Sequence, residues 1–215
     1  MRTFFVRHGS FVKRWSYTLA ALLAIVPASV MADSPQEEVT AVWKAQQVNF
    51  EYRGYSTTYS CRSLQDKLEI ILRTVGAREN VRLQGYVCDE QLGIARFQIS
   101  MQSPVIASEE NIRELTTHDS KDELVARVNG EQLPNANDVE RFPAVWKEVS
   151  FARDRYMRLE RGDCELVQQL RRQILPRMSV RIVKDRTNAC SSAFGNVGSP
   201  RLTVSALVPA KAPLN

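Results

Sequence analysis

An internal repeat constrains the fold of this chain more than any other feature. Ala41–Lys44 recurs as Ala144–Lys147, and a cysteine follows each lysine at the same distance, Cys61 in the first case and Cys164 in the second. Both matches share an offset of 103 residues. A shared offset between separate matches is typical of an internal repeat, and a repeat that is overlooked leads to a wrong fold assignment. We therefore interpret the two segments as copies of one unit.

The match continues beyond the cysteines with a small change of offset. Arg96–Ser100 resembles Arg201–Ser205, now 105 residues apart, and small loop insertions account for the shift. The sequence therefore predicts that residues 41–104 and 144–209 are the two copies.

Hydrophobic periodicity gives the secondary structure of the unit. Residues 48–52 alternate between apolar and polar side chains, as in a half-buried strand, whereas residues 64–75 carry apolar side chains at helical spacing. Residues 81–87 and 97–101 alternate again. We predict an α+β fold of two tandem β-α-β-β repeats, each with one disulfide inside the repeat.

Equivalent residues of the two copies are expected to have equivalent roles. Ser60 and Asp163 precede the two cysteines and are residue types that cap helix N-termini through side-chain oxygens. Trp43 and Trp146 begin the two copies, so we expect them to occupy equivalent positions.

The four cysteines predict disulfides rather than a metal site. An even number in an exported chain favours disulfides, and the duplication selects Cys61 with Cys88 and Cys164 with Cys190 from three possible connectivities. The long gaps between the cysteines do not fit zinc-ligand spacing. We predict no metal and no cofactor.

The N-terminal segment has the order of a secretory signal. Four basic residues without an acid precede the apolar run Leu19–Val30, and Val30–Ala32 has the small-x-small form of a cleavage site. We predict a signal peptide over residues 1–32, cleavage after Ala32, and a periplasmic or secreted mature protein without a stable membrane anchor. An uncleaved anchor is the alternative, although the run is shorter than the roughly 20 residues of a membrane-spanning helix.

Removal of the signal peptide changes the charge balance of the chain. The four basic residues lost from a total of 29 leave 25 against 24 acidic residues, so the sequence predicts no nucleic-acid partner. The predicted organisation is a first repeat over 33–104, an acidic connector over 105–143 and a second repeat over 144–215. The connector is expected to hold a short helix over 121–128.

Three segments carry a resemblance to a known family. Tyr59–Lys67, Gly162–Val167 and Ile174–Pro176 are similar to segments of an uncharacterised family of secreted or periplasmic proteobacterial proteins with a tandem cysteine-containing repeat. The resemblance covers nearly the whole mature chain. It implies a bacterial envelope origin and brings no activity, cofactor or catalytic residue.

The sequence offers weak candidates for catalysis. His118, Asp119 and Ser120 are triad residue types, but neighbours in one loop rarely reach triad geometry. We expect instead that Asp119 or Ser120 caps the connector helix. The remaining candidates are two carboxylate pairs that could serve as general acid and base, Asp66 with Glu69 and Asp89 with Glu90. We expect Asp66 and Glu69 to lie on a solvated helix face, and Asp89 and Glu90 to lie in a turn.

Arginine and tyrosine residues give the candidate binding surfaces, because both types are enriched at recognition sites. One set at the entrance to the second predicted helix, for which a solvated basic loop is the alternative, comprises Arg153, Arg155, Tyr156, Arg158 and Arg161. A second set comprises Tyr52, Tyr55, Tyr59 and Tyr86, for which core packing is the alternative.

The predicted function is that of an exported, non-catalytic binding module of the bacterial envelope. Its partner would be an envelope protein or an anionic polymer, since residues 144–215 hold 13 basic and six acidic residues. A periplasmic or secreted hydrolase, or an inhibitor of an envelope hydrolase, is the alternative.

Overall fold

The computed structural model describes residues 37–130, 132–133, 135–187 and 200–210. They belong to one compact unit, Pro35–Asn215. The predicted signal peptide and Cys190 lie outside the described residues.

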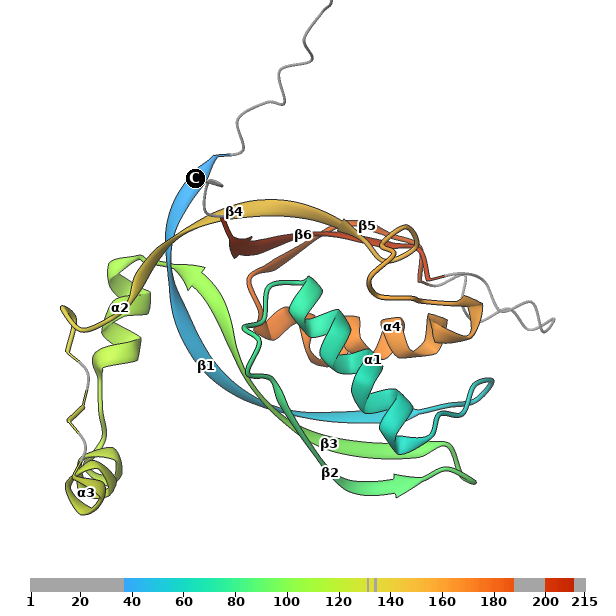
Figure 1. Ribbon diagram of the computed structural model, residues 1–215, viewed down its shortest axis with the longest axis horizontal. Coiled ribbons are helices and arrows are strands. Elements are labelled where there is room, and N and C mark those ends of the chain that lie inside the picture. Colours follow the sequence, from blue (N-terminus) through green and yellow to red (C-terminus); the bar gives the residue numbers. More distant parts are fainter. Residues whose placement is uncertain (1–36, 131, 134, 188–199, 211–215) are drawn as a thin grey trace, which may run out of the picture. The chain divides into compact units, whose positions relative to one another are not determined.

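The fold is α+β, as predicted, with one six-stranded antiparallel sheet in the order β2-β3-β1-β4-β6-β5 (Figure 1). The strands are β1 (Glu38–Arg53), β2 (Arg82–Asp89), β3 (Ile94–Ile106), β4 (Arg141–Ser150), β5 (Val180–Asp185) and β6 (Leu202–Pro209). The helices are α1 (Cys61–Thr74), α2 (Glu109–Thr116), α3 (Ser120–Asn129) and α4 (Cys164–Gln173), with short 3-10 helices η1 (Arg161–Asp163) and η2 (Leu175–Arg177).

Strands β1 and β4 join the two halves of the sheet over a short distance only. Glu38–Val42 pairs with Arg141–Val145, and beyond Val42 β1 no longer pairs with β4. The strands then diverge, and α1 and α4 lie between the arm formed by β1, β3 and β2 and the arm formed by β4, β6 and β5 (Figure 1).

One hydrophobic core fills the space between these arms. Phe50 and Phe97 contribute from the first arm, Phe151 from the position directly after β4, and Leu68 and Leu170 from the two helices, all fully buried. Both helices are amphipathic, so each needs an apolar surface to cover its buried stripe. The splayed sheet supplies that surface on both sides of the helices.

The two arms share their strand register. Val42 lies opposite Val105 in β3, and Val145, 103 residues further on, lies opposite Val208 in β6. The same offset holds at the far end of the ladder, where Val48 faces Ile99 and the Phe151 N–H donates to the Leu202 carbonyl at 2.9 Å.

This register corrects one detail of the repeat derived from the sequence. The sequence match placed the third strands 105 residues apart and so aligned Leu202 with Phe97, whereas the ladder aligns Leu202 with Ile99. A shift of two residues keeps every side chain on the same face of a strand, so the hydrophobic pattern cannot distinguish the two alignments.

The two tryptophans have similar surroundings. Trp43 lies opposite Pro104 in β3, and Trp146 lies opposite Leu207 in β6, again 103 residues apart. Arg78 lies 5.4 Å from the centre of the Trp43 ring and Arg181 3.9 Å from that of Trp146. Arg78 and Arg181 are also 103 residues apart.

The disulfide between Cys61 and Cys88 is present, as predicted, with the Cα atoms 6.0 Å apart. It links the first residue of α1 to β2. Cys164, the first residue of α4, is also disulfide-bonded, whereas its predicted partner Cys190 lies outside the described residues.

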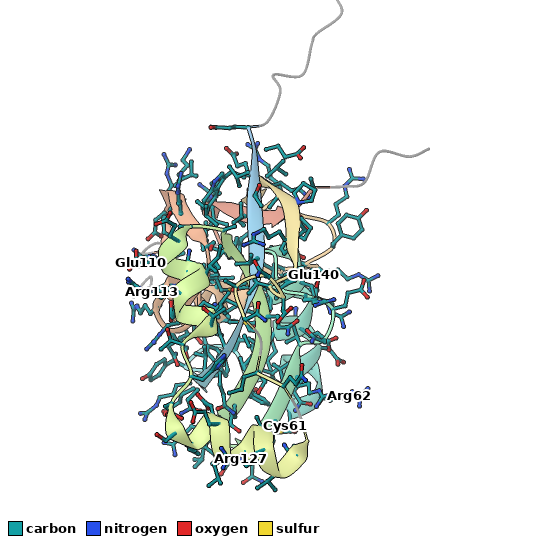
Figure 2. All side chains as sticks on the ribbon, turned by 90° about the vertical axis from the view of Figure 1, so that its left-hand side faces the viewer. Cys61, Arg62, Glu110, Arg113, Arg127 and Glu140 are labelled. Atoms are coloured by element: carbon teal, nitrogen blue, oxygen red, sulfur yellow. A yellow bond between two sulfur atoms is a disulfide. The ribbon has the colours of Figure 1, made fainter. Side chains whose placement is uncertain are left out.

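The connector contains two helices where the sequence predicted one. Helix α3 occupies the predicted place. Asp119 and Asp122 form a capping box at its N-terminus, and Gly130, in the left-handed conformation, caps its C-terminus. Helix α2 was missed, although Ser108 caps it. Figure 2 shows α2 and α3 with their charged side chains at the surface.

Candidate functional site

Two of the predicted binding residues line different grooves. Arg153 lines a groove beside β4, β5 and β6, whereas Arg158, which has a φ of 48°, lines a different groove beside the start of α1. Arg155 and Arg161 are exposed, and the Tyr156 side chain is 82% exposed.

The groove that contains Arg153 is strongly basic. Four cationic side chains line it together with Ser150, Thr203 and the single acid Glu148, and its volume is about 410 Å³. We call it the basic groove and define it by Arg153, Lys184, Arg186 and Arg201. Because Val149 and Val204 are buried and strand side chains alternate, Ser150 and Thr203 lie on the face opposite the core.

None of these four cations has an ion-pair partner among the residues that the structure describes. The nearby acid Asp185 is already engaged, because Arg171 of α4 contacts it at 2.6 Å. Burial raises the pKa of Asp185, but hydrogen bonds from Thr187 and the charge of Arg171 outweigh this effect and hold it below its ordinary value. The Asp185 carboxylate is therefore ionised, and its ion-pair partner is Arg171 rather than one of the four cations.

Three of the four residues that define the basic groove were not among the candidate binding residues predicted from the sequence. Lys184 lies in β5, Arg186 follows that strand, and Arg201 precedes β6. The excess of basic residues over 144–215 was the available signal, but it does not say which of them meet.

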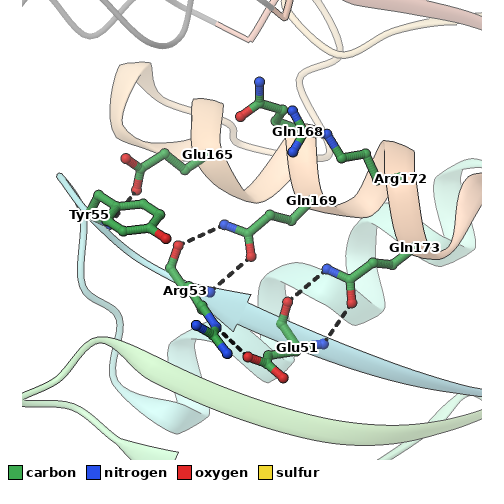
Figure 3. A pocket seen from close by; sticks show the side chains of 8 residues that line it. All are labelled: Glu51, Arg53, Tyr55, Glu165, Gln168, Gln169, Arg172 and Gln173. Carbon is green, nitrogen blue, oxygen red and sulfur yellow. Dashed lines mark hydrogen bonds and ion pairs between the residues drawn. The ribbon is translucent and has the colours of Figure 1, made fainter. Parts of the chain in front are cut away.

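A second groove, of about 620 Å³, lies between α4 and the end of β1 (Figure 3). We call it the polar groove. Its lining residues are Glu51, Arg53, Tyr55, Glu165, Gln168, Gln169, Arg172 and Gln173. Sequence reasoning singled out only Tyr55 among them.

Two glutamines of α4 complete the free edge of β1 at the polar groove. Gln173 accepts from the Glu51 N–H at 2.9 Å and donates to the Glu51 carbonyl at 2.8 Å. Gln169 makes the same pair of bonds to Arg53, at 2.9 and 2.7 Å (Figure 3). The side-chain amides thus replace the neighbouring strand that β1 lacks here.

Removal of both glutamines should loosen the end of β1. In the variant Gln169→Ala with Gln173→Ala, we expect amide hydrogen exchange at Glu51 and Arg53 to accelerate by about tenfold or more, because these N–H groups lose their acceptors. Exchange measured by NMR would test this. Gln168→Ala, on the same helix, is the matched control and should leave both rates unchanged; equal rates in the double variant and the control would contradict the prediction.

A buried ionic cluster joins the two halves of the chain, and the sequence did not predict it. The Asp163 carboxylate, 2% exposed as a residue, accepts from the Lys67 ammonium at 2.9 Å, from the Tyr59 hydroxyl, and from the Glu160 N–H at 2.6 Å. Asp163 therefore does not cap α4 through its side chain, and that expectation was wrong. Ser60 does cap α1, as predicted.

The tyrosines divide between the core and the surface. Tyr52 and Tyr59 pack edge to face with ring centres 5.2 Å apart, whereas Tyr55 and Tyr86 are 87% and 57% exposed. Burial, together with the hydrogen bond to Asp163, raises the pKa of Tyr59 well above its ordinary value. Tyr59 therefore stays neutral and keeps donating to the carboxylate.

The carboxylates considered for catalysis make structural contacts. Asp66 lies 3.6 Å from Arg62, and Glu69 lies 2.6 Å from Arg73, both one helical turn away. Asp89, the last residue of β2, accepts from two backbone N–H groups of the following turn. The carboxylate of the next residue, Glu90, accepts from the Cys61 N–H at 3.1 Å.

The described residues contain one cluster of potential metal ligands, formed by Cys61, Cys88 and Glu90. The two sulfur atoms are bonded to each other, so the thiolates that a soft metal requires are absent from the oxidised protein.

Across the described ranges, none of the helices combines the length and the apolar character needed to cross a membrane. Comparison of the chain with protein-family models, with curated proteins and with solved structures finds no match.

Proposed function

We propose that this chain is an exported, non-catalytic binding module of the bacterial envelope and that its basic groove holds an anionic polymer. The observation that carries the proposal is the convergence of four cations without ion-pair partners among the described residues. Such a cluster on the outer face of a sheet attracts a chain of negative charges, and the hydroxyls of Ser150 and Thr203 add hydrogen-bond donors.

The disulfide supports the exported location. Disulfides persist in oxidising compartments outside the cytoplasm, and the Cys61–Cys88 link is such a bond. The periplasm or the medium, with a signal peptide over residues 1–32, remains part of the proposal.

We also propose that the fold arose by tandem duplication of a β-α-β-β unit. The shared register of the β1–β3 and β4–β6 ladders, the two arginine-covered tryptophans and the cysteines at the start of α1 and α4 support it. Among the described residues, the basic groove lies in the second copy. In the first copy, the groove beside β1, β2 and β3 is lined by a single cation, Arg82, together with Ala45, Asn80 and Ser100. Elsewhere on this arm, Glu51 contacts both Arg53 and Arg96.

Binding of polyphosphate and of polygalacturonate to the purified protein would test the groove. Replacement of Arg153, Lys184, Arg186 and Arg201 together by Gln should weaken binding by about tenfold or more at low salt, and should also reduce its salt dependence, because the electrostatic attraction is lost. Fluorescence anisotropy of the labelled polymers over a salt series would measure both effects.

A control with the same change in net charge separates the groove from general charge attraction. Arg82, Arg113, Arg127 and Arg177, all exposed and outside the basic groove, would be replaced by Gln. This variant should bind nearly as well as the wild type. Equal loss in both variants, or no binding of either polymer by the wild type, would overturn the proposal.

A further inference from the structure

The polar groove carries an exposed aromatic side chain at its edge. Tyr55 is 87% exposed, and its ring lies between Glu165 and Arg53 in Figure 3. A tyrosine ring has an apolar face and a polar hydroxyl, so it can cover the apolar side of a ligand that is otherwise rich in polar groups.

The loop that presents Tyr55 is fixed by hydrogen bonds at each residue around it. The Glu165 carboxylate accepts from the N–H groups of Tyr55 and Ser56 at 3.0 and 3.1 Å, and the Gly54 N–H donates to the Gly93 carbonyl at 2.8 Å. A Cβ atom on Gly54 would collide with the Thr57 carbonyl oxygen. The backbone that carries the ring is therefore fixed before any ligand arrives, which lowers the entropy cost of ordering the loop on binding.

The groove also provides polar groups that the fold does not use. Gln169 and Gln173 are engaged with β1, whereas Gln168 and Arg172, one turn apart on the same helix, have no partner among the described residues. The hydrogen bond from Arg53, with a further one from Arg96, lowers the pKa of Glu51. Glu51 therefore carries a charge that is already paired, and the unused groups are an amide and a guanidinium.

We propose that the polar groove is a second binding site and that it takes a short saccharide stacked on Tyr55. The ring covers the C–H face of one sugar, and Gln168 and Arg172 donate hydrogen bonds to hydroxyl oxygens. An extended peptide fits less well, because the β1 backbone groups at Glu51 and Arg53 are already bonded to the glutamines and cannot pair with another strand.

Titration with neutral oligosaccharides tests this site separately from the basic groove. Cellotetraose and the tetramer of N-acetylglucosamine would be added to the protein while NMR follows the Tyr55 amide and the side-chain amide of Gln168. We expect saturable shifts at both positions with at least one probe. Tyr55→Ala should weaken binding by about tenfold or more, and Gln168→Ala should weaken it to a smaller extent.

Tyr156→Ala is the matched control, because Tyr156 is 82% exposed and does not line the polar groove. It should leave saccharide binding unchanged, as should the fourfold Gln variant of the basic groove, since the probes carry no charge. Absence of saturable shifts with both probes, or equal effects of Tyr55→Ala and Tyr156→Ala, would overturn the saccharide site without affecting the proposal for the basic groove.

Discussion

Replacement of Cys61 and Cys88 together by alanine should lower the free energy of unfolding by about 3.5 kcal/mol. The disulfide spans 27 residues, and on the chain-entropy model a loop of this length restricts the unfolded chain by about that amount. Cys88 is exposed and Cys61 half-buried, so the loss of side-chain packing adds little. Urea denaturation of the wild type and the double variant would measure the difference.

The control for the disulfide prediction uses the same two proteins in reductant. Reduction opens the crosslink in the wild type, so the difference in unfolding free energy between the two proteins should vanish under those conditions. A difference that survives reduction would show that the cysteine side chains act by packing. A loss below about 1 kcal/mol in oxidising buffer would contradict the crosslink argument.

Replacement of Lys67 by methionine should lower the free energy of unfolding by about 3 kcal/mol. The substitution leaves the Asp163 carboxylate buried with neutral partners only, and removal of one member of a buried ion pair is strongly destabilising. We expect less than the upper end of the known range, because the Lys67 side chain is itself 22% exposed and part of its attraction to Asp163 is screened.

Two further variants make this prediction specific to the buried charge. Arg62→Met breaks the exposed pair between Arg62 and Asp66 on the same helix and should cost less than about 0.5 kcal/mol. The addition of Asp163→Asn to Lys67→Met removes the unpaired charge and should restore part of the lost stability. If the double variant were less stable than Lys67→Met, the loss would not come from an uncompensated carboxylate.

Features that depend on residues close together in the chain could be predicted from the sequence. Hydrophobic periodicity placed α1 and the strands, because burial of one face imposes a period of 2 or 3.6. The caps at Ser60 and Asp119 were predictable for the same reason, since a capping oxygen bonds an N–H group a few residues away. The repeat then gave the Cys61–Cys88 pairing, which no local pattern contains.

Contacts between residues far apart in the chain could not be predicted in this way, because they depend on how the elements pack. Asp163 looked like a helix cap, but the packing of the two halves places its carboxylate against Tyr59 and Lys67, about a hundred residues earlier in the chain. The use of Gln169 and Gln173 depends on the divergence of β1 from β4. Hydrophobic periodicity does not depend on the angle between the two arms or on a shift of two residues in the pairing of a strand. Both changes leave the same side chains buried, so the sequence pattern stays the same.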